Sequence, residues 1–322
     1  MSKVSIIVPV YNTAQYLGRC LDSLISQSFT DIEILTINDG SPDNSKEILL
    51  KYADLDPRIR YIEKENGGYG SVLELGIKEA SAEFFMVCDS DDYLSAQCVE
   101  RLYKQATESD LDIVVGAKYI VYQGSDDEEY NDSKITGICP EIKAGTVYTD
   151  TAPFFFLEPS PHAKIFRKTL AEKISFPRKV SYTDYLLYSL CLERSHRVMY
   201  LSEPLAYYCV DRPGNSTTDQ NEKVFNDYYI VLKSVFEQMT LPVMYARQYI
   251  HFRYILSLLK NSSRKTKEKY FEKYSELLSL LSKNKTAITK EYPLKSFTTK
   301  TKLHILLFGP TGKLVLKKLI DY

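Results

Sequence analysis

The 322-residue sequence predicts an α/β fold with a mostly parallel central sheet flanked by helices, followed by a helical C-terminal region. Two observations predict it. Short apolar, β-rich runs alternate with segments of helical periodicity through the first 120 residues, and from about residue 221 the pattern is almost entirely helical. Strands separated by single helices are joined by right-handed crossovers, which makes the strands parallel.

The elements of the first half follow in a regular order. Apolar runs predict strands at residues 4–8, 32–37, 59–62, 84–88 and 111–115. Helical spacing predicts helices within residues 17–25, 48–55, 72–80 and 96–107. Because ligands bind at the carboxyl ends of the strands in such sheets, the residues that directly follow the strands are the candidates for function.

The second half is less regular. Residues 123–149 are polar and acidic and predict a long loop. "SYTDYLLYSLCLERS" predicts a helix, "VMYL" and "LAYYCV" predict two strands, and "YFEKYSELLSLL" predicts an amphipathic helix. We expect a first domain at residues 1–217, with one half at about 1–120 and another at about 121–217, and a helical region at 218–322.

Charge is distributed unevenly in a chain of otherwise ordinary globular composition. Hydrophobic residues make up 44% and charged residues 26%, and the formal net charge is −1. Residues 260–322 nevertheless hold 15 Lys/Arg against 5 Asp/Glu. A basic tail on an acidic body indicates an anionic membrane surface or a partner protein, and a solvated lysine-rich face is the alternative. We expect no nucleic-acid partner.

The cysteines and the N-terminal residues bear on the cellular compartment. The six cysteines show no CxxC and no metal-ligand spacing, which indicates buried thiols in a reducing compartment. No run approaches the ~18 apolar residues of a membrane-spanning helix. The start, "MSKVSIIVPVYN", lacks the features of a signal peptide. We therefore expect a cytoplasmic protein, with peripheral attachment to the inner face of the cell membrane as an extension of that expectation.

Three carboxylates, Asp89, Asp91 and Asp92, follow the fourth predicted strand within four positions. Neighbouring carboxylates raise each other's pKa unless they are neutralised, and Mg²⁺ or Mn²⁺ neutralises them while also accepting phosphate oxygens as ligands. A helix cap or a turn is the structural alternative for such a cluster taken alone. The sequence has neither GxGxxG after the first strand nor a Walker A motif, and "DSDDYLSAQ" lacks the central glycine of an EF-hand.

Four motifs in order resemble family 2 glycosyltransferases of the GT-A fold, a Rossmann-like α/β fold. They are "SIIVPVYN" (5–12), "INDGSPDNS" (37–45), "ENGGYGSVLELGI" (65–77) and "VCDSDDYL" (87–94). Weaker similarity continues through "HAKIFRK" (162–168), "YTDYLLYSL" (182–190) and "YYCVDRPGNST" (207–217). The resemblance implies an inverting hexosyltransferase that moves a sugar from a nucleotide-diphosphate sugar, usually a UDP-sugar, to a glycan, lipid-linked or glycoprotein acceptor.

The resemblance assigns the nucleotide site to residues that follow the first three strands: Pro9, Val10, Tyr11, Asp39, Asn66, Gly67 and Gly68. It implies that the Tyr11 ring stacks on the base and that Asp39 accepts a hydrogen bond from it. The glycines would let the backbone approach the nucleotide, since glycine permits close contact and positive φ. An Asx-turn at Asn38–Asp39–Gly40 and a helix-leading turn at Asn66, Gly67 and Gly68 are the structural alternatives.

The "DxD" part of the resemblance gives the metal and sugar contacts. It places Asp89 on the ribose or the metal, includes Ser90 in the nucleotide-sugar site, and makes Asp91 the ligand of Mn²⁺ or Mg²⁺ on the diphosphate. Arg212 would line the diphosphate, although a surface turn there is the alternative. Lys164, in "HAKIFRK", is expected to contact substrate.

The family's catalytic base is an aspartate at a helix start, which corresponds here to Asp184. The sequence departs from the family pattern at Thr183, where glutamate is usual. The structural alternative is an acidic capping box with Ser181 as N-cap and Asp184 as the third helical residue. The four histidines are scattered without ligand spacing, so we expect them to be structural or surface residues.

Three other classes of function compete with the glycosyltransferase. A sugar-1-phosphate nucleotidyltransferase would need a glycine-rich basic loop after the first strand, where "VYNTAQYLG" stands. A non-catalytic nucleotide-sugar or glycan-binding module would keep the sheet and lose the acids, and a structural scaffold would bind no nucleotide. The presence of Asp39, Asp89, Asp91 and Asp184 together favours the enzyme.

Overall fold

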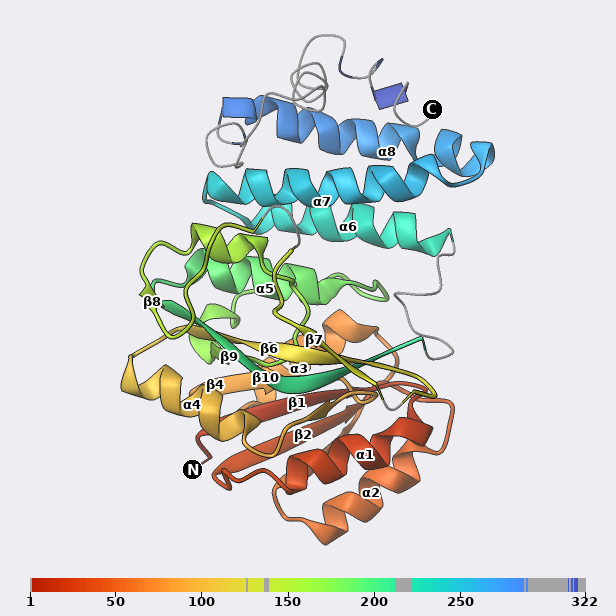
Figure 1. The fold of residues 1–322 in the computed structure, drawn as a ribbon. Coiled ribbons are helices and arrows are strands. Elements are labelled where there is room, and N and C mark those ends of the chain that lie inside the picture. Colours follow the sequence, from red (N-terminus) through yellow and green to blue (C-terminus); the bar gives the residue numbers. More distant parts are fainter. Residues whose placement is uncertain are drawn as a thin grey trace. The chain divides into compact units, whose positions relative to one another are not determined.

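A computed structural model describes residues 2–125, 127–135, 139–211, 222–286, 288, 312, 314, 316 and 317 (Figure 1). The chain divides into two compact units, Met1–Asp219 and Gln220–Tyr322. The domain boundary expected at residue 217 lies outside the described residues.

The first unit is built on a mixed sheet with the strand order β3-β2-β1-β4-β9-β6-β10-β5. The strands are β1 (Val4–Val10), β2 (Ile32–Asn38), β3 (Ile59–Glu63), β4 (Phe84–Val87), β5 (Tyr93–Leu94), β6 (Ile113–Tyr122), β7 (Glu128–Asn131), β8 (Val147–Tyr148), β9 (Lys164–Arg167) and β10 (Val198–Val210). The neighbours β3, β2, β1 and β4 run parallel, and β10 runs parallel to β6. Strand β9 is antiparallel to β4 and β6, β5 and β8 are antiparallel to β10, and β7 is antiparallel to β6.

Helices flank this sheet, as expected. They are α1 (Ala14–Ile25), α2 (Ser45–Leu55), α3 (Tyr69–Glu79), α4 (Cys98–Glu108) and α5 (Thr183–Arg194), with short 3₁₀ helices at Ala152–Phe156 and Lys168–Leu170. Strand β1 is buried along its whole length, which is typical of a parallel strand covered on both faces. Its residue Ile6 packs in the core with Leu21 of α1, whereas Ile7 points to α3, where a Cβ at Gly76 would lie 2.6 Å from Ile7 Cγ2.

Two predictions for the second half need correction. The loop predicted at residues 123–149 contains the short strands β7 and β8. The two strands predicted from "VMYL" and "LAYYCV" form one strand, β10, whose pairing register with β6 shifts on either side of Pro204. Proline has no N–H to donate to the ladder, so it interrupts the pairing pattern without ending the strand. The six cysteines, five of them buried, form no disulfide in the described chain.

In its described part, the second unit contains three long helices, α6 (Lys223–Gln238), α7 (Val243–Lys260) and α8 (Arg264–Lys283). The predicted apolar face of α8 is buried at Tyr274, Leu277 and Leu281. Its N-cap is Ser263, whose hydroxyl accepts from the Thr266 N–H at 3.2 Å. Within the ranges that the structure describes, no helix is long and apolar enough to cross a membrane.

Candidate active site

Asp39 follows β2 and lies at the centre of a buried cluster. Its N–H donates to the carbonyl of Val10 at the end of β1, at 3.0 Å. Its carboxylate accepts from the N–H groups of Gly67 at 2.9 Å and Gly68 at 2.8 Å, and also pairs with Lys64. A local turn also forms in this segment, where the Asn38 side-chain oxygen accepts from the Ser41 N–H at 2.9 Å. Asp39 therefore joins the ends of β1 and β2 to the turn that leads into α3.

The turn at Asn66, Gly67 and Gly68, here called the glycine turn, is held against the segment that precedes α5. Gly68 has φ +82°, and a Cβ at that position would lie 2.7 Å from Lys179 Cα. The Lys179 N–H donates to the Gly67 carbonyl at 2.7 Å. Asn66 completes the turn by donating its side-chain N–H to the Asp39 carbonyl at 3.0 Å. Close approach is thus required here by the protein's own backbone.

The other residues assigned to the nucleotide lie nearby in the fold. Pro9 and Val10 are the last two residues of β1, and Tyr11 directly after them is 52% exposed, which leaves its ring accessible. Ser90 is buried and its hydroxyl is 2.8 Å from the Thr13 hydroxyl. Arg212 lies outside the described residues.

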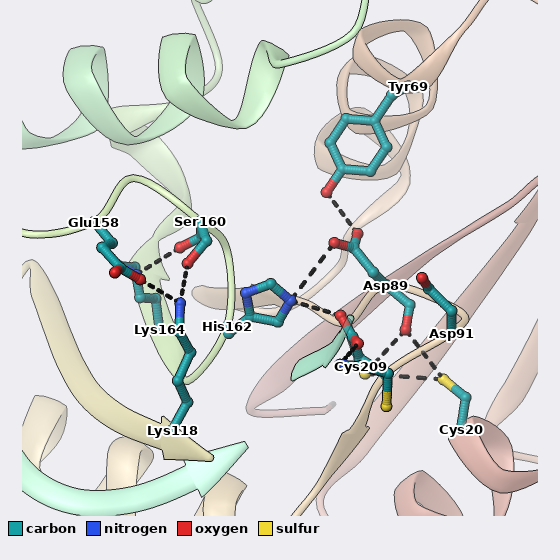
Figure 2. A network of polar contacts seen from close by, with 12 residues as sticks. Cys20, Tyr69, Asp89, Asp91, Lys118, Glu158, Ser160, His162, Lys164 and Cys209 are labelled. Carbon is teal, nitrogen blue, oxygen red and sulfur yellow. Dashed lines mark hydrogen bonds and ion pairs between the residues drawn. The ribbon is translucent and has the colours of Figure 1, made fainter. Parts of the chain in front are cut away.

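The carboxylates that follow β4 converge with a tyrosine and a histidine (Figure 2). The Tyr69 hydroxyl donates to Asp89 Oδ1 at 2.7 Å, and Asp89 Oδ2 lies 3.8 Å from His162 Nε2. His162 Nε2 is 2.5 Å from Asp92 Oδ2. The Cys209 N–H donates to the other Asp92 oxygen at 2.7 Å. Strand β10 thereby holds Asp92 through Cys209, and the segment before β9 supplies His162. These two residues are the neighbours of Asp89 in the cluster.

The charges of this cluster favour a divalent cation. Burial, together with the charges of Asp92 and Asp91, raises the pKa of Asp89 well above its usual value. Burial and the nearby lysines hold the pKa of His162 well below its usual value, so the imidazole is neutral at pH 7. The ligand atoms of Asp89, Asp92 and His162 lie within 4.8 Å of one another. Carboxylates and a neutral imidazole suit Mn²⁺ and related cations, so these residues fit the expected metal.

The cluster differs in membership from the expected metal pair. Asp89 belongs to it, whereas the carboxylate of Asp91 is not one of the three grouped ligands, although its charge acts on Asp89 and His162. His162 was not among the predicted site residues, because a histidine 70 residues from its aspartate partner carries no spacing signal. The available hint was its position in "HAKIFRK", two residues before Lys164.

Asp184 is the second residue of α5, which begins at Thr183. The capping-box alternative is wrong, because the N-cap is Tyr182 in the left-handed conformation (φ 65°), whose side chain makes no cap hydrogen bond, and Asp184 is the second rather than the third helical residue. Burial raises the pKa of Asp184 to about 6, while the N–H groups of Tyr185 and Asp184 and the lysines Lys164 and Lys118 favour its charged form. The charge of Asp184 raises the pKa of Tyr69 and of Asp89, which indicates that Asp184 lies near the acidic cluster.

Two buried lysines line the same region from the other side (Figure 2). Lys118 Nζ donates to Glu158 Oε2 at 2.6 Å and to Ser160 Oγ at 2.8 Å. Lys164 Nζ donates to the Ser160 carbonyl at 2.5 Å. Burial and the charge of Lys118 lower the pKa of Lys164 to about 7. These cations balance the carboxylates of Glu158 and Asp184 in a region from which water is largely excluded.

Comparison with known proteins agrees with this arrangement. The family model described as glycosyl transferase family 2 matches residues 5–175. Glycosyltransferase GlyA of Streptococcus pneumoniae is 34% identical over 227 residues, which cover 69% of this chain and 32% of that protein. The uncharacterized glycosyltransferase MG025 of Mycoplasma genitalium is 32% identical over 72% of this chain and 76% of its own length. The match to the uncharacterized glycosyltransferase EpsJ of Bacillus subtilis spans 40% of that protein, so the chain covers less than half of some relatives.

Solved structures show the same fold at low sequence identity. TarS 1–349 of S. aureus, crystallised with UDP-GlcNAc, has a TM-score of 0.76 and 18% identity, and the similarity covers 99% of this chain and 90% of that one. The mannosyltransferase PcManGT of Pyrobaculum calidifontis, in complex with GDP-Man and Mn²⁺, has a TM-score of 0.52 and 14% identity, over 99% of this chain and 85% of that one. The expected GT-A architecture is confirmed, and the family match over more than half of the chain shows that this protein belongs to glycosyl transferase family 2.

Proposed function

We propose that the chain transfers a sugar from a nucleotide-diphosphate donor, preferably a UDP-sugar, to a hydroxyl group of a glycan, lipid-linked or protein-linked acceptor. The observation that carries the proposal is the buried cluster at the end of β4, where the Tyr69 hydroxyl donates to Asp89 Oδ1 at 2.7 Å and Asp89 Oδ2 lies 3.8 Å from His162 Nε2, with Asp184 near enough to raise the pKa of the same tyrosine. The charges of Asp89 and Asp91 at the end of β4 and of Asp184 at the start of α5 raise the pKa of Tyr69. Asp184 is 95 and 93 positions from the other two in the chain. Such a grouping provides a donor-side acid cluster next to a separate base.

Asp184 is suited to act as the general base. Its pKa of about 6 leaves it mostly ionised at neutral pH, yet basic enough to take a proton from an acceptor hydroxyl. Proton transfer to Asp184 makes the acceptor oxygen a better nucleophile. That oxygen then attacks the anomeric carbon while the bond to the diphosphate breaks. A single displacement inverts the anomeric centre, so an α-linked donor would give a β-glycoside.

The donor would be held by the residues at the ends of β1 to β4. Tyr11 would stack on the base, and backbone and side-chain groups around Asp39 and Ser90 would face the nucleoside. Asp89, Asp92 and His162 would hold Mn²⁺ or Mg²⁺, with Asp91 close by to complete the coordination or to orient bound water. When bound, the cation supplies positive charge to the departing diphosphate.

The competing binding-module hypothesis is distinguished by chemistry. A module that binds nucleotide-sugars without turning them over has no use for a base with a raised pKa beside the acid cluster. The binding-module hypothesis predicts that nucleotide-sugars bind but that none is consumed, whichever acceptor is supplied. A nucleotidyltransferase would instead release pyrophosphate from a nucleoside triphosphate, which can be measured in the same samples.

The test is a thermal-shift panel of UDP-, GDP-, CMP- and dTDP-sugars with and without Mn²⁺. A ligand at 100 times its dissociation constant adds about 2.7 kcal/mol of stability. We expect a Mn²⁺-dependent shift with one nucleotide class, and loss of the Mn²⁺-dependent part in His162→Ala. Asp91→Ala in parallel decides whether Asp91 is itself a ligand. Absence of any shift in the wild-type protein would refute the proposal.

We further propose that the C-terminal helical region attaches the enzyme to an anionic membrane surface or to a partner protein on the cytoplasmic side. Arg264, Lys265, Lys269 and Lys283 are exposed on α8. Vesicles containing anionic lipid should sediment the full chain at low salt, and added salt should release it, because basic residues near the surface are screened within a Debye length. Equal binding to neutral vesicles would contradict the electrostatic basis.

A further inference from the structure

Tyr69 is the first residue of α3, and its hydroxyl is the hydrogen-bond partner of Asp89 (Figure 2). The residue belongs to the motif "ENGGYGSVLELGI", but the activity proposed above gives it no role. The phenol hydroxyl is the hydrogen-bond donor in this contact, at 2.7 Å from Asp89 Oδ1.

The two oxygens of Asp89 have different neighbours. Oδ1 accepts the Tyr69 hydroxyl at 2.7 Å, and Oδ2 lies 3.8 Å from His162 Nε2. Among the described residues, Tyr69 is the one that donates a hydrogen bond to this carboxylate. Rotation of an aspartate carboxylate about its last bond is a soft, two-fold torsion. A single donor on one side is then what determines which way the carboxylate turns.

Tyr69 is itself held firmly at its backbone. The preceding residue, Gly68, donates its N–H to Asp39 and packs against the Lys179 backbone. Asp92 and His162 are held independently, by the Cys209 N–H and by each other. Asp89 is thus the member of the cluster whose orientation depends on a side chain from the glycine turn.

We propose that Tyr69 is a positioning residue of the cation site, which fixes Asp89 with one oxygen turned toward His162 and Asp92. The inference rests on the proposed function in one respect, that the cluster binds a divalent cation. Hydrogen bonds to metal-ligating carboxylates typically change metal affinity or activity by about 10- to 100-fold when they are removed. The Tyr69 hydroxyl would therefore strengthen cation binding without touching the cation.

The experiment measures Mn²⁺ binding by the wild-type chain and two variants, through the electron paramagnetic resonance signal of free Mn²⁺. Tyr69→Phe removes the hydroxyl and keeps the ring. Tyr52→Phe is the matched control, because the Tyr52 hydroxyl donates to Asp22 at the same 2.7 Å in a contact between α2 and α1. We expect the Mn²⁺ dissociation constant to rise about 10- to 100-fold in Tyr69→Phe and to stay unchanged in Tyr52→Phe.

Equal Mn²⁺ affinity in Tyr69→Phe and wild type would overturn the inference and leave the proposed function intact. A wild-type chain that binds no Mn²⁺ would overturn the inference and the metal-dependent part of the proposed function together. An equal loss in Tyr52→Phe would show a general effect of removing a phenol and would also overturn it. If Tyr69→Phe does not fold, Tyr69→Leu is measured instead; failure of both to fold would assign the hydroxyl to stability and overturn the positioning role.

Discussion

Replacing Gly68 by alanine should test whether the glycine turn sets the position of the candidate base. At φ +82° and ψ 167°, Gly68 occupies a region that is essentially restricted to glycine. Occupying it with a side chain costs roughly 1–3 kcal/mol. The new Cβ would also lie 2.7 Å from Lys179 Cα and 2.8 Å from Lys179 N. Because both neighbours are backbone atoms, the segment that leads into α5 must move to relieve the overlap.

We expect Gly68→Ala to lose about 2 kcal/mol or more of unfolding free energy, which is roughly 4–8 °C in melting temperature for a unit of this size. The displaced segment carries Asp184 at the start of α5, so kcat should fall even where the protein remains folded. A misplacement of about 1 Å can cost about 100-fold in rate. Differential scanning calorimetry and donor-turnover kinetics on the same preparation measure the two effects.

Gly124→Ala provides the control. Gly124 has a similar φ of +81°, but a Cβ there would have no neighbour within 4 Å. It therefore incurs the backbone strain without the contact. If the two variants lost the same stability and both kept wild-type kcat, the Lys179 contact would not be the reason for glycine at position 68, and the reasoning would be refuted.

Three further predictions concern the site itself. Asp184→Asn should lower kcat about 10²- to 10⁴-fold with nucleotide affinity unchanged in titration calorimetry, because it removes only the base; a parallel loss of nucleotide affinity would contradict that role. In the wild-type chain, kcat/KM should fall about tenfold per pH unit below pH about 6, because protonation of Asp184 (pKa about 6, raised by burial) removes the base; a profile flat down to pH 5 would count against Asp184. Removal of metal by a chelator should abolish activity. Added Mn²⁺ should restore the activity of the control variant His196→Ala, which changes an exposed histidine, but not that of His162→Ala. Full restoration in both variants would exclude His162 as a ligand.

The fold was largely predictable from local sequence. Periodicity of apolar residues identified the parallel strands β1 to β4 and the helices between them, because side-chain burial on a strand or a helix repeats over a few neighbouring residues. It failed at β7 and β8, where the pairing partner rather than the local composition makes a polar segment extended. It also divided β10 at Pro204, since a proline looks locally like a break.

Sequence alone also determined the types of residue at the site, through motifs whose order and spacing resemble family 2 glycosyltransferases. Each motif covers or directly follows the carboxyl end of a strand, and the carboxyl ends of parallel strands meet at one edge, so the strand pattern was enough to assign Asp39 and Asp89 to the same edge. Asp184 could be proposed only through the resemblance, because its distance along the chain from the other acids carries no geometric information.

Only the tertiary structure decided which residues touch. The partnership of His162 with Asp92 joins positions 70 residues apart, and the hydrogen bond from Tyr69 to Asp89 joins two separate motifs. The requirement for glycine at position 68 comes from the backbone of Lys179, more than a hundred residues later. Such contacts depend on how whole elements pack across the sheet, and no local property of either partner specifies them. The sequence by itself thus determined the fold class and proposed the acids of the candidate site, and the packing of distant segments decided how those acids are held.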